Sequence, residues 1–341
     1  MTDSPTSLAA SPLQATELPQ SVDPPACERD SQAAKATLVS VVIPCYNYAR
    51  FLDQAIQSAL DQNYPAIEIV VVNDGSTDDP AAVVARFPMV QFVTQENRGL
   101  AAARNTGLAH CKGDLVVFLD ADDRLLPEAI VTGARLLEAN PALGFAVGYS
   151  TLISGDGLAQ PTVNKPGCEG DDAYVSLLRR NTIRNPGTVL FRRQIVETVG
   201  GFAPGVDACA DYALYLRISR SYPVVFHDVV VSEYRRHSEN MSNNSAEMLR
   251  QALCVLRRQR SYLVTRARRQ AFRDGIRNIR IYYGEQLVTQ IRMRIRKRSE
   301  WGQLLRDLGV LIRCHPAGVV EHAARKISTL WRGRDPGALG A

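Results

Sequence analysis

Continuous apolar runs that alternate with helical segments constrain the fold of this chain more than any other sequence feature. Apolar residues dominate LVSVVIP, IEIVVVND, VQFVTQ and DLVVFLD, at residues 38–44, 67–74, 90–95 and 114–120. Helical spacing is found between and after these runs, at residues 50–62, 80–87, 99–111 and 127–140. Unbroken apolar strands that alternate with helices are typical of parallel sheets covered on both faces. We therefore expect an α/β fold with a mostly parallel sheet sandwiched by helices.

Three carboxylates follow the fourth run, because VVFLDADDR places Asp120, Asp122 and Asp123 at the end of a strand. In an open α/β sheet the carboxyl ends of the strands line the ligand crevice. Clustered carboxylates repel one another and resist desolvation, so we expect a cation here. A hard divalent cation binds carboxylate oxygens and can bridge to substrate phosphates. The alternative is that Asp122 and Asp123 begin the next helix, where acids suit the dipole, but this does not explain Asp120.

A second acidic turn follows the second run. Asp74 ends that strand, Gly75 permits a tight turn, and Ser76 and Thr77 can cap a helix. A carboxylate there can accept a hydrogen bond from the N3–H of uracil or from a ribose hydroxyl, whereas the alternative is a plain turn and cap residue. Because neither GxGxxG nor GxxxxGK(S/T) is present, the sequence does not support a Rossmann dehydrogenase or a P-loop enzyme.

Cysteine usage and the amino terminus indicate a cytoplasmic protein. The seven cysteines are dispersed without a CxxC pair, which fits reduced thiols better than a disulfide framework. The first residues lack the basic-then-apolar layout of a signal peptide, and no apolar run reaches the roughly 20 residues of a membrane helix. We expect a protein that is either soluble in the cytoplasm or peripheral on the cytoplasmic face of the membrane.

The carboxyl-terminal region is basic, with 21 Lys and Arg against 6 Asp and Glu in residues 250–341. Within it, apolar residues at helical spacing form one face. Three explanations stay open. The helices either pack on the preceding domain with a solvated basic face, rest on an anionic membrane surface, or bind nucleic acid. Nucleic acid is not expected as a partner, since no recognition motif accompanies the charge. The face consists of Ile276, Ile279, Tyr283, Leu287 and Ile291.

Several motifs in order resemble the family-2 glycosyltransferases with the GT-A fold. The resemblance covers roughly residues 38–240 and rests on VSVVIPCYN, VVVNDGSTDD, ENRGLAAARNTG, VVFLDADD and ADYALYLR. It implies an inverting transferase that uses a nucleotide-sugar donor and a divalent metal, Mn²⁺ or Mg²⁺. The implied reaction moves a sugar from a nucleotide-diphosphate donor, expected to be a UDP-sugar, to a hydroxyl of a saccharide or lipid-linked acceptor in cell-surface glycan synthesis.

The resemblance also implies roles for individual residues. In the nucleotide-sugar site, Asp120 faces the ribose, and the other members of the set are Pro44, Tyr46, Asn47, Asp74 and Arg104. Asp122 binds the metal. His237 is either a further metal ligand or an isolated surface histidine. Asp211 acts as the general base. The alternative is that Asp211 only stabilises the start of a helix.

Two positions depart from the family pattern. Asn73 stands where an acid usually precedes Asp74, and Ala210 replaces the acid before Asp211. Ala210 motivates an alternative function, a non-catalytic nucleotide-sugar-binding or scaffolding member of the same fold. If Asp211 is not the base, Glu233 or Asp207 is the next candidate. A nucleotidyltransferase is less well supported, because no phosphate-grasping loop rich in Gly, Arg and Lys follows the first strand.

These features divide the chain into three expected parts. Residues 1–36, rich in Ser, Pro, Ala and Thr without periodicity, indicate a disordered leader. Residues 37–245 form the expected GT-A catalytic domain. Residues 246–341 form the expected basic helical region.

Overall fold

The computed structural model describes residues 36–170, 172–298 and 300–316. The expected leader therefore lies outside the described residues except for Ala36, as does the end of the expected basic region. The division of the chain into three parts remains a proposal.

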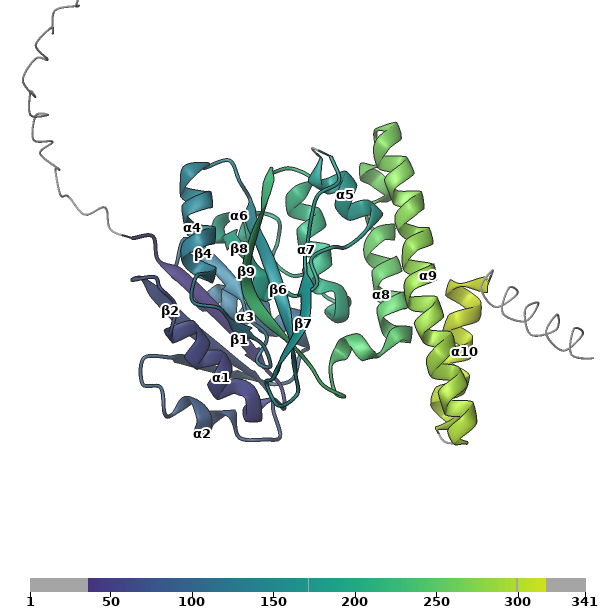
Figure 1. The fold of residues 1–341 in the computed structure, drawn as a ribbon, viewed down its shortest axis with the longest axis horizontal. Coiled ribbons are helices and arrows are strands. Elements are labelled where there is room, and N and C mark those ends of the chain that lie inside the picture. The colour runs from purple at the N-terminus through teal and green to yellow at the C-terminus, as the bar shows by residue number, and fades with distance from the viewer. Residues whose placement is uncertain (1–35, 171, 299, 317–341) are drawn as a thin grey trace, which may run out of the picture. The chain divides into compact units, whose positions relative to one another are not determined.

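The described residues form one mixed sheet of nine strands, in the order β3-β2-β1-β4-β8-β6-β9-β5, with β7 paired to β6 (Figure 1). The four expected strands pair in parallel; they are β1 (Val39–Cys45), β2 (Ile67–Asp74), β3 (Gln91–Gln95) and β4 (Leu115–Phe118). The remaining strands are β5 (Arg124–Leu125), β6 (Phe145–Ser154), β7 (Ala159–Asn164), β8 (Val189–Arg192) and β9 (Val224–Arg236). β8 is antiparallel to both β4 and β6, whereas β6 and β9 are parallel. The expected α/β architecture is confirmed.

Helices cover both faces of the sheet, because side chains alternate along each strand. On β1, Val41 and Ile43 join the core beneath α1 and α4, while Val42 joins the core on the opposite face with α3 and α7. α1 buries Leu52 and Ile56, four residues apart on one face. The helices of this part are α1 (Ala49–Leu60), α2 (Pro80–Val84), α3 (Leu100–His110), α4 (Ala129–Ala139), α5 (Ala173–Arg179), α6 (Arg193–Thr198) and α7 (Ala210–Ser219).

Three further helices follow: α8 (Ser245–Arg257), α9 (Arg266–Lys297) and α10 (Trp301–Cys314). Val255 and Leu256 of α8 belong to the same buried cluster as Phe118 of β4. α9 approaches α5 closely, since a Cβ at Gly275 would lie 2.0 Å from the carbonyl oxygen of Leu178. The helices α8 and α9 are therefore packed into the core of the preceding domain.

The apolar face expected on α9 packs inside the protein. Leu287 and Ile291 are buried against α8 and α10, and Ile276, Ile279 and Tyr283 pack beside them. Packing, rather than lipid, accounts for this face. None of the helices in the described parts of the chain combines the length and the apolar character that a membrane span requires.

Candidate active site

A cleft of about 1530 Å³ opens at the carboxyl ends of β1, β2 and β4 and extends to α7 and α9. This is the edge where an α/β sheet binds ligands. Of the nine predicted site residues, His237 alone is not part of the lining. The eight that line the cleft are Pro44, Tyr46, Asn47, Asp74, Arg104, Asp120, Asp122 and Asp211.

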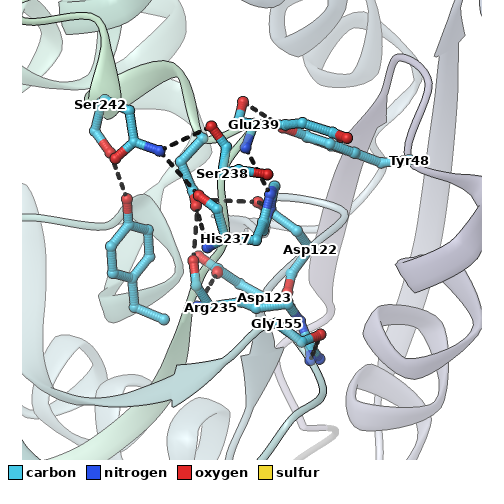
Figure 2. Close-up of polar contacts among 12 residues, drawn as sticks. Tyr48, Asp122, Asp123, Gly155, Arg235, His237, Ser238, Glu239 and Ser242 are labelled. Atoms are coloured by element: carbon cyan, nitrogen blue, oxygen red, sulfur yellow. Dashed lines mark hydrogen bonds and ion pairs between the residues drawn. The ribbon is translucent and has the colours of Figure 1, made fainter. Parts of the chain in front are cut away.

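Asp122 and His237 contact each other although 115 residues separate them (Figure 2). The distance from His237 Nε2 to Asp122 Oδ2 is 3.0 Å, and each side chain is only 8% exposed. The Glu239 amide donates to His237 Nδ1 over 3.2 Å, so in the neutral ring the proton lies on Nε2 and is donated to Asp122. The rings of Tyr48 and Phe51 pack around the imidazole, with centroids 5.4 and 5.2 Å away. His237 is therefore not an isolated surface histidine.

The Asp122–His237 pair is compatible with one divalent cation once the imidazole proton moves from Nε2 to Nδ1, which requires the Glu239 amide to release its hydrogen bond to Nδ1. An octahedral ion with ligands about 2.1 Å away holds adjacent donor atoms about 3 Å apart, which matches this pair. A carboxylate oxygen with an imidazole nitrogen suits Mn²⁺, while Mg²⁺ prefers oxygen alone. No cluster of three or more His, Cys, Asp or Glu that could hold a metal occurs within the described ranges. Substrate phosphates and water are the further ligands that such a cation commonly takes.

Asp123 has a structural position rather than one at the start of a helix. It is buried, and α4 begins only at Ala129. Its carboxylate accepts hydrogen bonds from the amide of Arg235, over 2.9 Å, and from Asn185 Nδ2, over 3.0 Å. Burial raises the pKa of Asp123 well above its usual value, and Asp122 and Asp120 add to this shift. The idea that Asp122 and Asp123 begin a helix is wrong.

Arg235 is a site residue that the sequence analysis missed. It is almost completely buried, and its guanidinium donates to the Asp122 carbonyl over 2.7 Å and to Gln54 Oε1 over 2.8 Å. A third bond of 3.2 Å reaches the carbonyl of Gly155 (Figure 2). Arg235 therefore holds the main chain at Asp122 against α1 and the β6–β7 turn. Successive side chains of a strand point to opposite faces of the sheet, so one of Arg235 and Arg236 had to point inward. This alternation is the sequence signal that could have indicated a buried arginine.

Asp74 caps α3 at the edge of the cleft. Its Oδ1 accepts from Gln95 Nε2 over 2.7 Å and from the Arg98 amide over 2.9 Å, and its Oδ2 accepts from the Gly99 amide over 3.0 Å. Asp207 caps the same helix end, accepting from the Ala101 amide over 3.0 Å. Two carboxylates thus stabilise the amino terminus of α3, as its dipole favours. The cap expected as an alternative for Asp74 is present.

The turns after β1 and β2 are joined by hydrogen bonds. Asn47, with φ of 58°, accepts from the Thr77 amide over 2.7 Å and donates its own amide to Ser76 Oγ over 3.1 Å. Asparagine tolerates this left-handed conformation better than most residues. Asn73 accepts from the Ser76 amide over 2.9 Å, so the asparagine that departs from the family pattern stabilises this turn. Beside it, Tyr46 is exposed to the cleft.

Arg104 links α3 to the acidic turn after β4. Its Nη2 donates to Asp120 Oδ1 over 2.6 Å, and its guanidinium lies over the ring of Phe202. Its Nε has no hydrogen-bond partner within the described part of the chain. Burial opposes the charge of Arg104, but Asp120 and Asp211 together raise its pKa. Burial raises the pKa of Asp120, and Arg104 opposes that shift.

Asp211 lies in the first turn of α7 and lines the cleft. Burial raises its pKa to about 6, although Arg104 lowers it in part. Its Oδ1 accepts a hydrogen bond from the amide of Tyr212 over 2.7 Å, and no ion pair to Asp211 is present among the described residues. Glu233 is paired with Arg124 over 2.6 Å. Of the three base candidates, Asp211 is the carboxylate left available, since Asp207 caps α3.

Comparison with known proteins identifies the family. The family model described as Glycosyl transferase family 2 matches residues 40–200. The chain is 32% identical to uncharacterized protein MT1568 of Mycobacterium tuberculosis over 219 residues, 59% of this chain and 67% of that protein. The chain belongs to glycosyl transferase family 2. It is also 28% identical to the chondroitin synthase of Escherichia coli over 61% of this chain and 30% of the synthase.

Two solved structures share the fold of this chain. S. aureus TarS 1–349 in complex with UDP-GlcNAc has a TM-score of 0.59 at 15% identity and covers 81% of each chain. The mannosyltransferase PcManGT of Pyrobaculum calidifontis, in complex with GDP-Man and Mn²⁺, has a TM-score of 0.55 at 19% identity and covers 88% of each. The GT-A fold and the family resemblance are therefore confirmed. The chain spans 30% of the E. coli synthase and 58% of a Nostoc glycosyltransferase, so whole-protein activity is a matter for proposal.

Replacing Asp211 with Asn should stabilise the protein at pH 8. The pKa of Asp211 in the folded protein lies above the ordinary value of 3.8, so ionising this buried carboxylate destabilises the folded state. The free energy of unfolding therefore falls as the pH rises from about 4 through about 6. At about 1.4 kcal/mol per pKa unit, and discounted for partial exposure, the gain is about 1–2 kcal/mol at pH 8. Urea unfolding between pH 4 and 8 measures it.

The gain should shrink as the pH falls through about 6 and vanish near pH 4. The exposed Asp114, changed to Asn, is the matched control and should alter stability little. An Asp211→Asn protein that is less stable than wild type at pH 8 would contradict the burial of an ionised carboxylate.

Proposed function

We propose that the protein is an inverting, metal-dependent glycosyltransferase. It moves a sugar from a nucleotide-diphosphate donor, in our proposal a UDP-sugar, to a hydroxyl of a saccharide or lipid-linked acceptor in cell-surface glycan synthesis. The observation that carries the proposal is one cleft lined by Asp120, Asp122 and Asp211 together.

The donor side of the cleft offers groups suited to a nucleotide. Tyr46 presents an exposed ring, and the joined turns at Asn47 form a fixed wall beside it. Asp74 already accepts three hydrogen bonds, and a carboxylate has about four acceptor positions, so one remains for a base N–H. Asp120, oriented by Arg104, is assigned to the ribose. The neighbours that bind UDP-GlcNAc and GDP-Man support a nucleotide-sugar donor.

Asp122 and His237 are the residues assigned to hold Mn²⁺ or Mg²⁺. When bound, the cation supplies a Lewis acid that stabilises the charge of the diphosphate leaving group. Arg235 and Asn240 fix the position of Asp122, because Arg235 binds its carbonyl and Asn240 Nδ2 lies 3.4 Å from its Oδ2. The neighbour that binds GDP-Man together with Mn²⁺ supports this assignment.

Asp211 is assigned as the general base. It takes the proton of the acceptor hydroxyl while that oxygen forms a bond to the anomeric carbon and the bond to the diphosphate oxygen breaks. Attack from the face opposite the leaving group inverts the anomeric configuration. A pKa of about 6 leaves Asp211 mostly ionised at neutral pH and still basic enough to accept a proton. If the protein were non-catalytic, as the alternative suggested by Ala210 holds, the Asp211 carboxylate would have no function in the cleft.

The first functional prediction concerns Asp122. Asp122→Asn should lower the Mn²⁺-dependent affinity for a UDP-sugar by about tenfold or more, since even indirect partners of a metal ligand contribute that much. Calorimetry with UDP-GlcNAc, UDP-Glc and GDP-Man, with and without Mn²⁺, measures affinity, and nucleotide release measures donor hydrolysis. The control is Asp114→Asn. A metal requirement unchanged in Asp122→Asn would remove this residue from the metal site, and donor binding without nucleotide release for every acceptor would favour the non-catalytic alternative.

The second functional prediction concerns Asp211. Asp211→Asn should reduce the transfer rate about 10²–10⁴-fold, the usual contribution of a general base. Donor affinity should stay near that of wild type, because the carboxylate acts only in the transition state. The wild-type kcat should fall as the pH drops below about 6, where Asp211 becomes protonated. Near-normal transfer by the variant would assign the base role elsewhere.

We also propose that the protein associates peripherally with anionic membranes through α10. Trp301, Leu305 and Ile312 are exposed on one face of this helix, and Arg306 and Arg313 are exposed beside them. Apolar side chains flanked by cations are typical of helices that lie in a membrane interface. Each Lys or Arg near an anionic surface contributes about 1 kcal/mol of attraction.

Vesicle sedimentation tests this association. The protein should bind phosphatidylglycerol vesicles more tightly than phosphatidylcholine vesicles, and salt should weaken binding, since the Debye length is about 8 Å at physiological ionic strength. Changing both Trp301 and Leu305 to Ser should reduce binding about tenfold. Met89→Ser, which alters an exposed side chain elsewhere, is the control. Truncation at residue 250 is unsuitable, because α8 and α9 belong to the core. Absence of binding to either vesicle at low salt would contradict the proposal.

A further inference from the structure

The cleft continues beyond the catalytic centre into a corner between the end of α5 and the middle of α9. Asn278 Nδ2 donates to the carbonyl of Arg179 over 3.1 Å, which fixes α9 against the end of α5. Arg180 and Arg184 follow in the chain, and both line the cleft and are exposed. Their side chains form no ion pair within the described residues, whereas Arg179 is paired with Glu169 over 2.7 Å. The corner therefore presents two uncompensated guanidinium groups.

The part of α9 that lines the cleft near this corner carries exposed apolar side chains among polar ones such as Glu285 and Gln286. Ile281 and Tyr282, one turn beyond Asn278 on α9, line the cleft and are 51% and 48% exposed. They are not part of the α9 face that packs against α8 and α10. Single exposed apolar residues are ordinary, but apolar side chains inside a cleft beside unpaired cations suit an amphiphilic anion. We name these four residues, Arg180, Arg184, Ile281 and Tyr282, the amphiphile corner.

The amphiphile corner lies in the same cleft as Asp211. Tyr283 is close to both Asp211 and Arg184: burial raises the pKa of its hydroxyl, Asp211 adds to this rise, and Arg184 lowers it. Arg184 and the proposed base Asp211 therefore both lie in the neighbourhood of Tyr283.

We propose that the amphiphile corner binds an acceptor whose sugar is linked through a phosphate or diphosphate to an apolar chain. This inference rests on the proposed function and narrows its acceptor to the lipid-linked class. Guanidinium groups bind phosphate oxygens with two parallel hydrogen bonds, which suits Arg180 and Arg184 to the linking group. Ile281 and Tyr282 contact the beginning of the apolar chain. The sugar then lies between the linking phosphate and Asp211, where its hydroxyl is deprotonated.

Farnesyl diphosphate is the probe that tests the corner by calorimetry on the full-length protein. The buffer contains EDTA, so the probe cannot bind through a cation at Asp122. Farnesyl diphosphate should bind, and both farnesol and inorganic pyrophosphate should bind about tenfold more weakly, since each lacks one half of the recognition. Equal binding of pyrophosphate would overturn the apolar half, and equal binding of farnesol would overturn the phosphate half.

Variants locate the binding. Arg180 and Arg184 changed together to Ala should weaken farnesyl diphosphate binding about tenfold or more, because charge-assisted hydrogen bonds are lost. Arg135→Ala, which removes an exposed arginine of α4 outside the cleft, is the matched control and should bind normally. Ile281→Ser with Tyr282→Ser should weaken binding of farnesyl diphosphate but not of pyrophosphate. Thermal unfolding confirms that each variant is folded.

The outcomes separate this inference from the proposed function. Donor hydrolysis without farnesyl diphosphate binding overturns the corner and leaves the glycosyltransferase proposal intact. Binding that depends on Arg180 and Arg184, in a protein that never hydrolyses a donor, supports the corner and contradicts the proposed reaction. Binding that is unchanged in the double arginine variant overturns the corner.

Discussion

The candidate site depends on one buried carboxylate, Asp123, which joins the turn after β4 to the end of β9. A buried carboxylate is costly unless hydrogen bonds satisfy it, and here the Arg235 amide and Asn185 supply them. This contact brings together segments 112 residues apart. The Arg235 side chain donates a hydrogen bond to the Asp122 carbonyl. His237, two residues further along the chain, lies beside the Asp122 carboxylate. The Asp123 contact therefore acts together with the pairing of β5 and β9 to bring the two proposed metal ligands close to each other.

A second constraint is α3, which connects the two sides of the cleft. Asp74 from β2 and Asp207 from the segment before α7 both cap its amino terminus. The segments that carry Asp74 and Asp207 are therefore both fixed to one helix. Arg104 of the same helix donates a hydrogen bond to Asp120, and the nearby charge of Asp211 raises the pKa of Arg104. The buried guanidinium of Arg104 therefore compensates the charges of Asp120 and Asp211, which would otherwise repel each other.

Apolar runs and helical spacing in the sequence predict the strands and helices that form from neighbouring residues. Buried parallel strands have continuous apolar runs, so β1 to β4 and the helices between them were predicted, and the motif residues followed from the ends of those strands. β6, β7 and α5 were not predicted, because the sequence of β6 mixes apolar and polar residues and its partners β8 and β9 lie far away in the chain. The roles of Asp123 and Arg235 were missed for the same reason: their partners are distant in sequence. The apolar face of α9 was found, but its spacing alone does not distinguish a protein neighbour from a lipid.

We propose that one cleft holds a donor diphosphate at Asp122, with His237 in contact with Asp122 but outside the cleft lining, and presents the donor sugar to Asp211. A crystal structure of the protein with Mn²⁺ and a hydrolysed-donor product, UDP, tests this arrangement. We expect anomalous density for Mn²⁺ in contact with Asp122 Oδ2, His237 Nε2 and the diphosphate, with uracil beside Tyr46 and Asp74. Manganese bound away from Asp122, or UDP in the corner formed by Arg180 and Arg184, would contradict it.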